Sequence, residues 1–124
     1  MRYLLDTHIF LWWMNNDTRL KASGKEIIES KTNFIYLSIV SAWEISIKIK
    51  TNSKFKLRTT IKRAFEISSF KILDISFNHV LSLHKLPMYH KDPFDRMLIA
   101  QAKVEKCTLI TDDSKIKKYN VSTL

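Results

Sequence analysis

Short strand-like runs alternate with helix-like segments along the whole chain. Strands are predicted at 2–5, 34–37, 71–75, 108–111 and 121–123. Helical spacing predicts helices at 8–14, 24–31, 39–50, 57–69 and 93–106, a further one between Ser76 and Pro87, and a short basic one near 114–118. Parallel strands need such crossover connections, so this order predicts an α/β fold whose mainly parallel sheet is covered by helices on both faces.

Several helix starts carry capping residues. Ser23 and Glu26 have the spacing of a capping box. Ser38 and Ser76 each precede an apolar periodic segment. Asp92-Pro93 puts a capping carboxylate before a proline at the first helical position. We therefore expect Asp92 to act as a helix cap rather than as a ligand.

The length of 124 residues predicts a single domain over residues 1–124. Cys107 is the only cysteine, which excludes an intrachain disulfide and fits a reducing compartment; we expect it in the core. Asp6 interrupts the first apolar run, which excludes a signal peptide, and no apolar run approaches the ~18 residues of a membrane span. These features favour a cytoplasmic protein without a membrane partner.

The formal net charge is +9 at pH 7. A basic surface favours polyanions, of which nucleic acid is the commonest. A solvated basic face without any partner has the same composition, so charge alone does not decide between the two.

The acidic residues are few, and some of them occupy special places. Asp6 closes the first predicted strand, and Asp112 and Asp113 close the fourth. The carboxyl ends of parallel strands are where ligands bind in such sheets. Asp95 lies in the first turn of the helix 93–106, and Glu44 lies inside an otherwise apolar helical stretch. These acids are candidates for one common site.

Each acid also has a plain structural role open to it. Asp6 and Asp113 are suited to helix caps, and Glu44 to an ion pair with Lys48 at the i+4 position. Carboxylates gathered at one edge would nevertheless repel each other unless a hard cation neutralised them. Mg²⁺ prefers such oxygen ligands, and it suits the in-line displacement of a phosphodiester.

Four motifs occur in order: LLDTH at 4–8, SAWEI at 41–45, HKDPFDRMLIAQA at 90–102 and LITDD at 109–113. Together they resemble PIN-domain proteins of the VapC type, the toxins of type II VapBC toxin–antitoxin pairs. The resemblance spans essentially the whole chain, and the motif around Asp95 is the most specific part. It implies a three-layer α/β/α PIN-like fold, Mg²⁺- or Mn²⁺-dependent endoribonuclease activity, a homodimer, and inhibition by a VapB-type antitoxin.

The resemblance also implies catalytic and metal-binding residues, carried over position by position. They are Asp6, Glu44, Asp95 and Asp113. Asp6 and Asp95 are expected to bind metal directly, whereas Glu44 and Asp113 bind a second metal or orient water. Asp112 is the immediate alternative to Asp113.

Thr7, Asp112 and Arg96 are candidates for supporting roles. Thr7 is suited to bonding a ligand carboxylate or water, or to capping a helix. Arg96 is suited to contacting phosphate, although an exposed helical arginine is the simpler interpretation. Lys48 is suited to contacting RNA, to pairing with Glu44, or to simple solvation.

Histidines and tryptophans receive no role in the chemistry. Metal-bound water needs no histidine as its base, which applies to His8, His84 and His90. Burial in the core or at a dimer face is favoured over base stacking for Trp12, Trp13 and Trp43.

Other classes fit less well. A phosphatase that forms an aspartyl-phosphate usually has a second Asp where this chain has His8, and a receiver domain has paired acids near its start. A PIN module that binds RNA or antitoxin without cleaving, or a nuclease that cuts DNA, remains an alternative. The target RNA and the number of metals are not determined by these motifs.

Overall fold

The strands form one sheet in which every pairing is parallel. The structure is a computed structural model that describes residues 1–121 and 123. The four-stranded sheet has the order β3-β2-β1-β4. Its strands are β1 (Arg2–Leu5), β2 (Phe34–Ser38), β3 (Lys71–Leu73) and β4 (Thr108–Ile110). The central strand β1 pairs with β2 on one side and with β4 on the other, so the predicted parallel sheet is confirmed.

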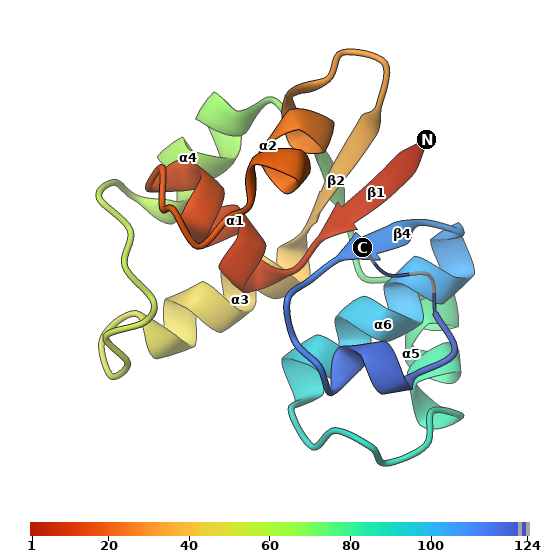
Figure 1. The fold of residues 1–124 in the computed structure, drawn as a ribbon. Coiled ribbons are helices and arrows are strands. Elements are labelled where there is room, and N and C mark those ends of the chain that lie inside the picture. The colour runs from red at the N-terminus through yellow and green to blue at the C-terminus, as the bar shows by residue number, and fades with distance from the viewer. Residues whose placement is uncertain (122, 124) are drawn as a thin grey trace.

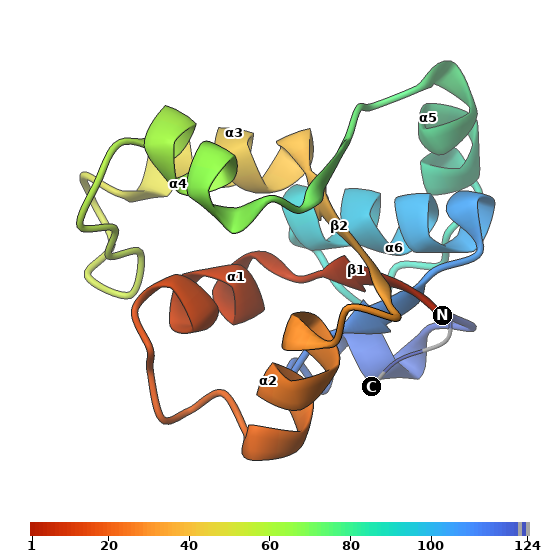
Figure 2. The same ribbon diagram turned by 90° about the horizontal axis from the view of Figure 1, so that it is seen from above.

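Helices cover both faces of this sheet (Figures 1 and 2). They are α1 (Thr7–Met14), α2 (Ala22–Glu29), α3 (Ile39–Lys48), α4 (Ile61–Ser68), α5 (Phe77–His84), α6 (Pro93–Glu105) and the 3₁₀ helix η1 (Ile116–Lys118). In Figure 1, α1, α2 and α4 lie on one side of β1 and β2, whereas α5 and α6 lie on the other. The predicted three-layer α/β/α architecture is confirmed.

The alternation of side chains along β1 divides the core in two. Successive residues of a strand point to opposite faces. Leu5 therefore packs in a cluster with Phe10 of α1, and Leu4 packs in a second cluster with Leu98 of α6 and Leu109 of β4. All five side chains are buried. The two clusters fix the helical layers against the sheet and thereby fix its carboxyl edge.

Two predicted helix starts differ from the structure. The capping box at Ser23 is wrong: α2 begins at Ala22 after Lys21, which makes no side-chain cap, and Ser23 lies within the first turn. Leu20 packs against the core just before this helix. The helix predicted from 57 begins only at Ile61, because the hydroxyl of Thr60 caps it.

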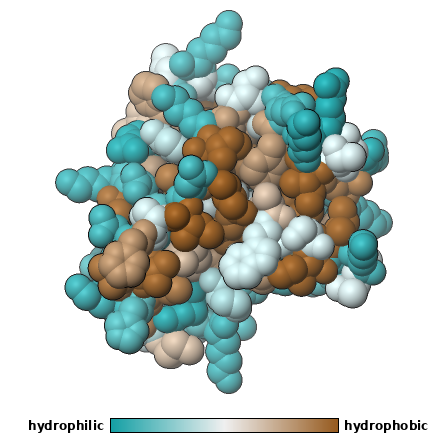
Figure 3. All heavy atoms as spheres, turned by 180° about the vertical axis from the view of Figure 1, so that it is seen from behind, coloured by the Kyte–Doolittle hydropathy of each residue, from teal (hydrophilic) through white to brown (hydrophobic). Residues whose placement is uncertain are grey.

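The buried side of α3 is more polar than its apolar spacing suggests. The side chains of Trp43 and Ile47 in this helix are 54% and 51% exposed. The buried face contains Ser41 and Glu44 beside its apolar residues. Figure 3 views the whole molecule from behind and shows hydrophobic side chains gathered near the middle of this outer surface.

The C-terminal residues form less regular secondary structure than predicted. The helix expected at 114–118 is a single 3₁₀ turn. Of the strand expected at 121–123, Thr123 forms an isolated parallel bridge with Leu109, and Ser122 lies outside the described residues. Within the described part of the chain, no helix is both long and apolar enough to cross a membrane.

Ser38 gives a test of this framework. Its buried hydroxyl accepts from the backbone N–H of Val40 at 3.0 Å and donates to Oε1 of Gln101 in α6 at 2.6 Å. Ser38→Ala removes the cap and leaves the glutamine oxygen unpaired, so the free energy of unfolding should fall by about 1–3 kcal/mol. Urea unfolding measures this loss. Ser46→Ala, at an exposed position of the same helix, is the control; equal losses for both variants would contradict the role of Ser38.

Candidate metal centre

The topology brings acids from four elements to the carboxyl edge of the sheet. Asp6 follows β1 and Asp113 follows β4, and these two strands are neighbours. Glu44 comes from α3, which begins where β2 ends, and Asp95 comes from the first turn of α6. Since β2 and β4 lie on opposite sides of β1, this edge is where the strand order reverses, as in other open parallel sheets that bind ligands.

Asp6 is a helix cap and a member of this cluster at once. One of its oxygens accepts from the backbone N–H of His8 at 2.9 Å and caps α1. The other accepts the hydroxyl proton of Thr111 at 2.6 Å, which ties the end of β1 to the end of β4. Its side chain is buried, and this burial raises the pKa of the carboxyl despite both hydrogen bonds.

Glu44 is a buried carboxylate with one unsatisfied oxygen. Its Oε2 lies 2.7 Å from Nζ of Lys48, which confirms the predicted i+4 ion pair. The glutamate side chain is only 3% exposed, so this is not a surface pair. Its Oε1 is buried and has no hydrogen-bond partner among the described residues. Buried polar atoms are rarely left without a partner, and a bound ion or water is a usual explanation.

Asp92 caps α6, as predicted. Its Oδ1 accepts from the backbone N–H groups of Phe94 at 2.8 Å and Asp95 at 3.0 Å. Its Oδ2 lies 3.2 Å from Nζ of Lys48, so one ammonium joins Asp92 to Glu44. Burial raises the pKa of Asp92, but the backbone donors and Lys48 outweigh it and leave that pKa below its ordinary value. The cap therefore stays ionised beside the cluster.

Asp95 lies where two groups of potential metal ligands meet. In each group, one ligand atom per residue lies within 4.8 Å of the others. The groups are His90, Asp95 and Asp113, and Glu44, Asp92 and Asp95. Burial, followed by the nearby carboxylates, raises the pKa of Asp95 to about 8. These carboxylates are Asp6, Asp92, Glu44 and Asp113. Burial and the neighbouring negative charges thus strongly disfavour the ionised form of Asp95.

His90 is a member of the cluster that the sequence did not assign. Its Nε2 lies 2.8 Å from Oδ2 of Asp95 and 3.5 Å from Oδ2 of Asp113. Its backbone N–H donates to the hydroxyl of Tyr119 at 2.9 Å. The sequence feature that could have indicated this is its position as the first residue of the HKDPFDR motif. The side chain is positioned either to orient Asp95 or to supply a nitrogen ligand.

The structure separates the two consecutive acids after β4. Asp113 faces His90 and contributes to the raised pKa of Asp95. Asp112 is exposed and belongs to neither ligand group. Asp6 is also outside both groups, although its charge acts on Asp95. Of the two alternatives at this position, the geometry favours Asp113.

Thr7 and Arg96, two of the predicted supporting residues, make contacts within the protein. The hydroxyl of Thr7 is buried and pairs with that of Ser41 at 2.9 Å, which joins α1 to α3. Arg96 is not an exposed arginine: its guanidinium donates to the carbonyl of Pro87 at 2.8 Å and to the hydroxyl of Tyr119 at 3.2 Å. Arg96 therefore holds the loop that carries His90 rather than reaching outward toward phosphate.

The remaining aromatic candidates fall into three environments. Trp12 and Trp13 are partly buried against the core, as expected. Trp43 is exposed, with its ring edge on Phe94 at 4.9 Å between centroids. His8 packs on Phe55 and lines a cavity beside Asp6, whereas His84 is exposed at the end of α5. Cys107 is buried, as predicted.

Comparisons with known proteins agree with this architecture. The family model described as the PIN domain matches residues 3–121. Among solved structures, VapBC2 from Rickettsia felis bound to a DNA fragment from their promoter is 20% identical, with 100% of this chain and 98% of that chain covered and a TM-score of 0.75. A toxin–antitoxin complex from Klebsiella pneumoniae is also 20% identical, with 98% and 95% covered and a TM-score of 0.65.

A third solved structure, VapBC-1 from nontypeable Haemophilus influenzae, is 15% identical, with 100% and 97% covered and a TM-score of 0.64. At these identities the likeness concerns the fold. No curated protein matches the chain. The predicted PIN-like fold is confirmed.

The raised pKa of Asp95 predicts how stability depends on pH without metal. Between pH 3.8 and about pH 8, the carboxyl of Asp95 is deprotonated in the unfolded chain but still protonated in the folded protein. Folding then takes up a proton, so this group lowers the free energy of unfolding as pH rises through that window. In EDTA, the melting temperature of the wild type should fall with pH more steeply than that of Asp95→Asn. Parallel curves for the two proteins would contradict the assignment.

Proposed function

Because the chain belongs to the PIN domain family, we propose that it is a divalent-metal-dependent endoribonuclease and the toxin of a VapBC-type toxin–antitoxin pair. The observation that carries the proposal is the buried carboxylate of Glu44. Its Oε1 has no partner among the described residues, and Glu44 belongs to one group of potential ligands with Asp95. An acidic cluster with such an oxygen fits a bound cation better than a purely structural network.

The donor set suits a hard cation. Mg²⁺ takes oxygen ligands from one or two carboxylates and keeps several waters. Mn²⁺ accepts the same oxygens, and imidazole nitrogen suits transition metals more than Mg²⁺. Asp95 would contribute to either ligand group, and with a cation present its ionised form would no longer be penalised by its neighbours. The proposed catalytic and metal-binding residues are Asp6, Glu44, Asp95 and Asp113.

When bound, the metal would lower the pKa of a water and stabilise charge that develops on the phosphate. The protein's own groups hold the carboxylates ready for this. Thr111 fixes the orientation of Asp6, Lys48 fixes Glu44, and His90 contacts Asp95. The pairing of Lys48 with both Glu44 and Asp92 also limits the repulsion within the cluster.

The surroundings of the cluster suit a polyanion. A cavity of about 250 Å³ is lined by Asp6 and Asp113 and also by Arg19 and Lys54. Cations beside a metal-binding acidic site would hold the phosphates that flank the scissile one. Together with the net charge of +9, this supports a nucleic-acid substrate, and the VapC-type resemblance favours RNA over DNA.

The proposed partners follow from the solved structures that share the fold. These are named as VapBC or toxin–antitoxin complexes, so we assign this chain a VapB-type antitoxin and a cytoplasmic location. We assign a second copy of the chain to the face shown in Figure 3. Large apolar side chains exposed on α3, β3 and α5 support a protein interface; among them are Trp43, Ile47, Ile72 and Leu81.

Cleavage of total cellular RNA by the purified protein with Mg²⁺ tests the activity. Asp95→Asn and Glu44→Gln should each lower the rate at least about a hundredfold, since several kcal/mol of transition-state stabilisation depend on the metal. EDTA should abolish the fragments.

Two matched variants control this measurement. Asp92→Asn keeps a good helix cap and should retain much of the activity. Glu66→Gln removes an exposed acid from α4 and should change nothing. Unchanged cleavage by Asp95→Asn would exclude that residue as a ligand. Cleavage of DNA but not RNA, or of neither by a folded protein, would contradict the proposed activity.

A further inference from the structure

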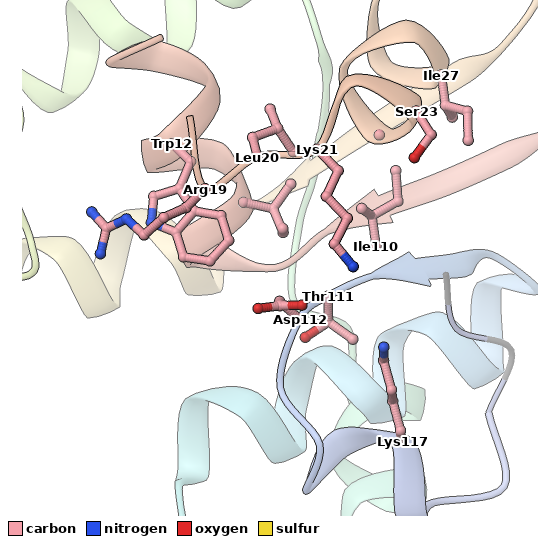
Figure 4. Close-up of a pocket in the computed structure, with 12 residues that line it drawn as sticks. Trp12, Arg19, Leu20, Lys21, Ser23, Ile27, Ile110, Thr111, Asp112 and Lys117 are labelled. Atoms are coloured by element: carbon pink, nitrogen blue, oxygen red, sulfur yellow. The ribbon is translucent and has the colours of Figure 1, made fainter. Parts of the chain in front are cut away.

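A second pocket lies next to the candidate metal centre, at the carboxyl ends of β1 and β4. Its volume is about 220 Å³, and α1, α2, the loop between them, the end of β4 and η1 form its walls (Figure 4). Drug-sized ligands occupy pockets of roughly 300–1,000 Å³. This one suits a single flat ring system rather than a larger molecule.

The floor of the pocket is apolar and partly aromatic. It is made by Ile9, Trp12, Leu20, Ile27 and Ile110. Trp12 is half-buried, and the guanidinium of Arg19 lies 5.2 Å from its ring centroid. A flat π-system would find both an apolar floor and a tryptophan–arginine pair against which to stack.

The rim is mostly cationic. Figure 4 shows the side chains of Lys21 and Lys117 reaching toward one another near Thr111 and Asp112. Neither lysine lies within ion-pairing distance of a carboxylate among the described residues, whereas Arg19 is paired with Asp17. Two ammonium groups at the mouth are placed to bind an anion such as a phosphate.

The pocket and the cavity at the metal centre are neighbours. The cavity beside Asp6 and Asp113 shares Ile9, Trp12 and Asp112 with the walls of this pocket. Thr111, which lines the pocket, donates its hydroxyl proton to Asp6. A ligand seated here therefore lies directly beside the proposed scissile phosphate.

We propose that this pocket binds one unpaired nucleotide of the RNA next to the cleaved bond. The base lies on the apolar floor beside Trp12, and Lys21 and Lys117 hold its backbone phosphate. This inference rests on the proposed function, and it names the part of the substrate that the protein recognises. An apolar slot with cations on only its rim fits a nucleotide better than a free phosphate.

Asp112 gives the pocket a preference among bases. Its exposed carboxylate is an acceptor only, so it favours a base whose edge carries an amino group. Cytosine and adenine present such an amino group, whereas the only edge donor of uracil, N3–H, lies between two carbonyl oxygens that repel a carboxylate. The pocket should therefore bind oligocytidine and oligoadenosine more tightly than oligouridine.

Binding of fluorescein-labelled RNA hexamers to Asp95→Asn protein tests the inference without requiring cleavage. Fluorescence anisotropy is measured with C₆, A₆ and U₆ over a range of salt concentrations. Gly24→Leu fills the pocket from α2, where an added Cβ would lie 3.3 Å from the flexible end of Leu20. It should weaken binding of C₆ and A₆ at least about fivefold and remove their advantage over U₆.

Lys117→Gln tests the phosphate contact and, since Lys117 is exposed, leaves the fold intact even if Gly24→Leu does not fold. The plot of log K against log salt concentration has a negative slope, and this variant should make that slope shallower by about 0.7. Lys103→Gln, which makes the same charge change in the last turn of α6, is the control and should keep that slope.

The inference would be overturned if the parent and both pocket variants had the same affinity, base preference and salt slope. The pocket would then be better explained as a binding site for a segment of a protein partner. This outcome differs from failure of the proposed function, which would appear as a wild type that does not cleave RNA.

Discussion

Repulsion among carboxylates at one edge of a parallel sheet is the constraint on which the rest of the site depends. The strand order brings Asp6 and Asp113 together, and the helices that follow β2 and precede β4 add Glu44 and Asp95. Burial and mutual charge raise the pKa of Asp95 to about 8. The fold therefore holds an arrangement that is electrostatically unfavourable without a cation and suited to binding one.

The surrounding contacts limit this cost without removing it. Lys48 pairs with Glu44 and Asp92, and the hydroxyl of Thr111 bonds to Asp6. His90 contacts Asp95 from a loop that Arg96 and Tyr119 hold in place. One oxygen of Glu44 stays buried and unpaired among the described residues. The carboxylates are thus held in position before any ligand arrives, as a preorganised site requires.

Much of this arrangement follows from the sequence, because strand ends and helix starts are local features. The places of Asp6, Asp113 and Asp95 could be predicted from the apolar runs they close or open, and Asp92 from its capping pattern. The position of His90 could not, since it depends on a hydrogen bond from its backbone to Tyr119, which is distant in the sequence, and on the loop that Arg96 holds in place. The capping box at Ser23 is wrong because α2 already includes Ala22, so Ser23 lies within the first turn and not at the N-cap position.

Direct measurement of metal binding tests the central claim, that this cluster is a cation site. Isothermal titration of metal-free protein with Mn²⁺ should give saturable binding, and Asp95→Asn should weaken it at least about tenfold because Asp95 belongs to both ligand groups. Glu66→Gln should bind as the wild type does. Absence of saturable binding by the folded wild type, or equal binding by Asp95→Asn, would contradict the account.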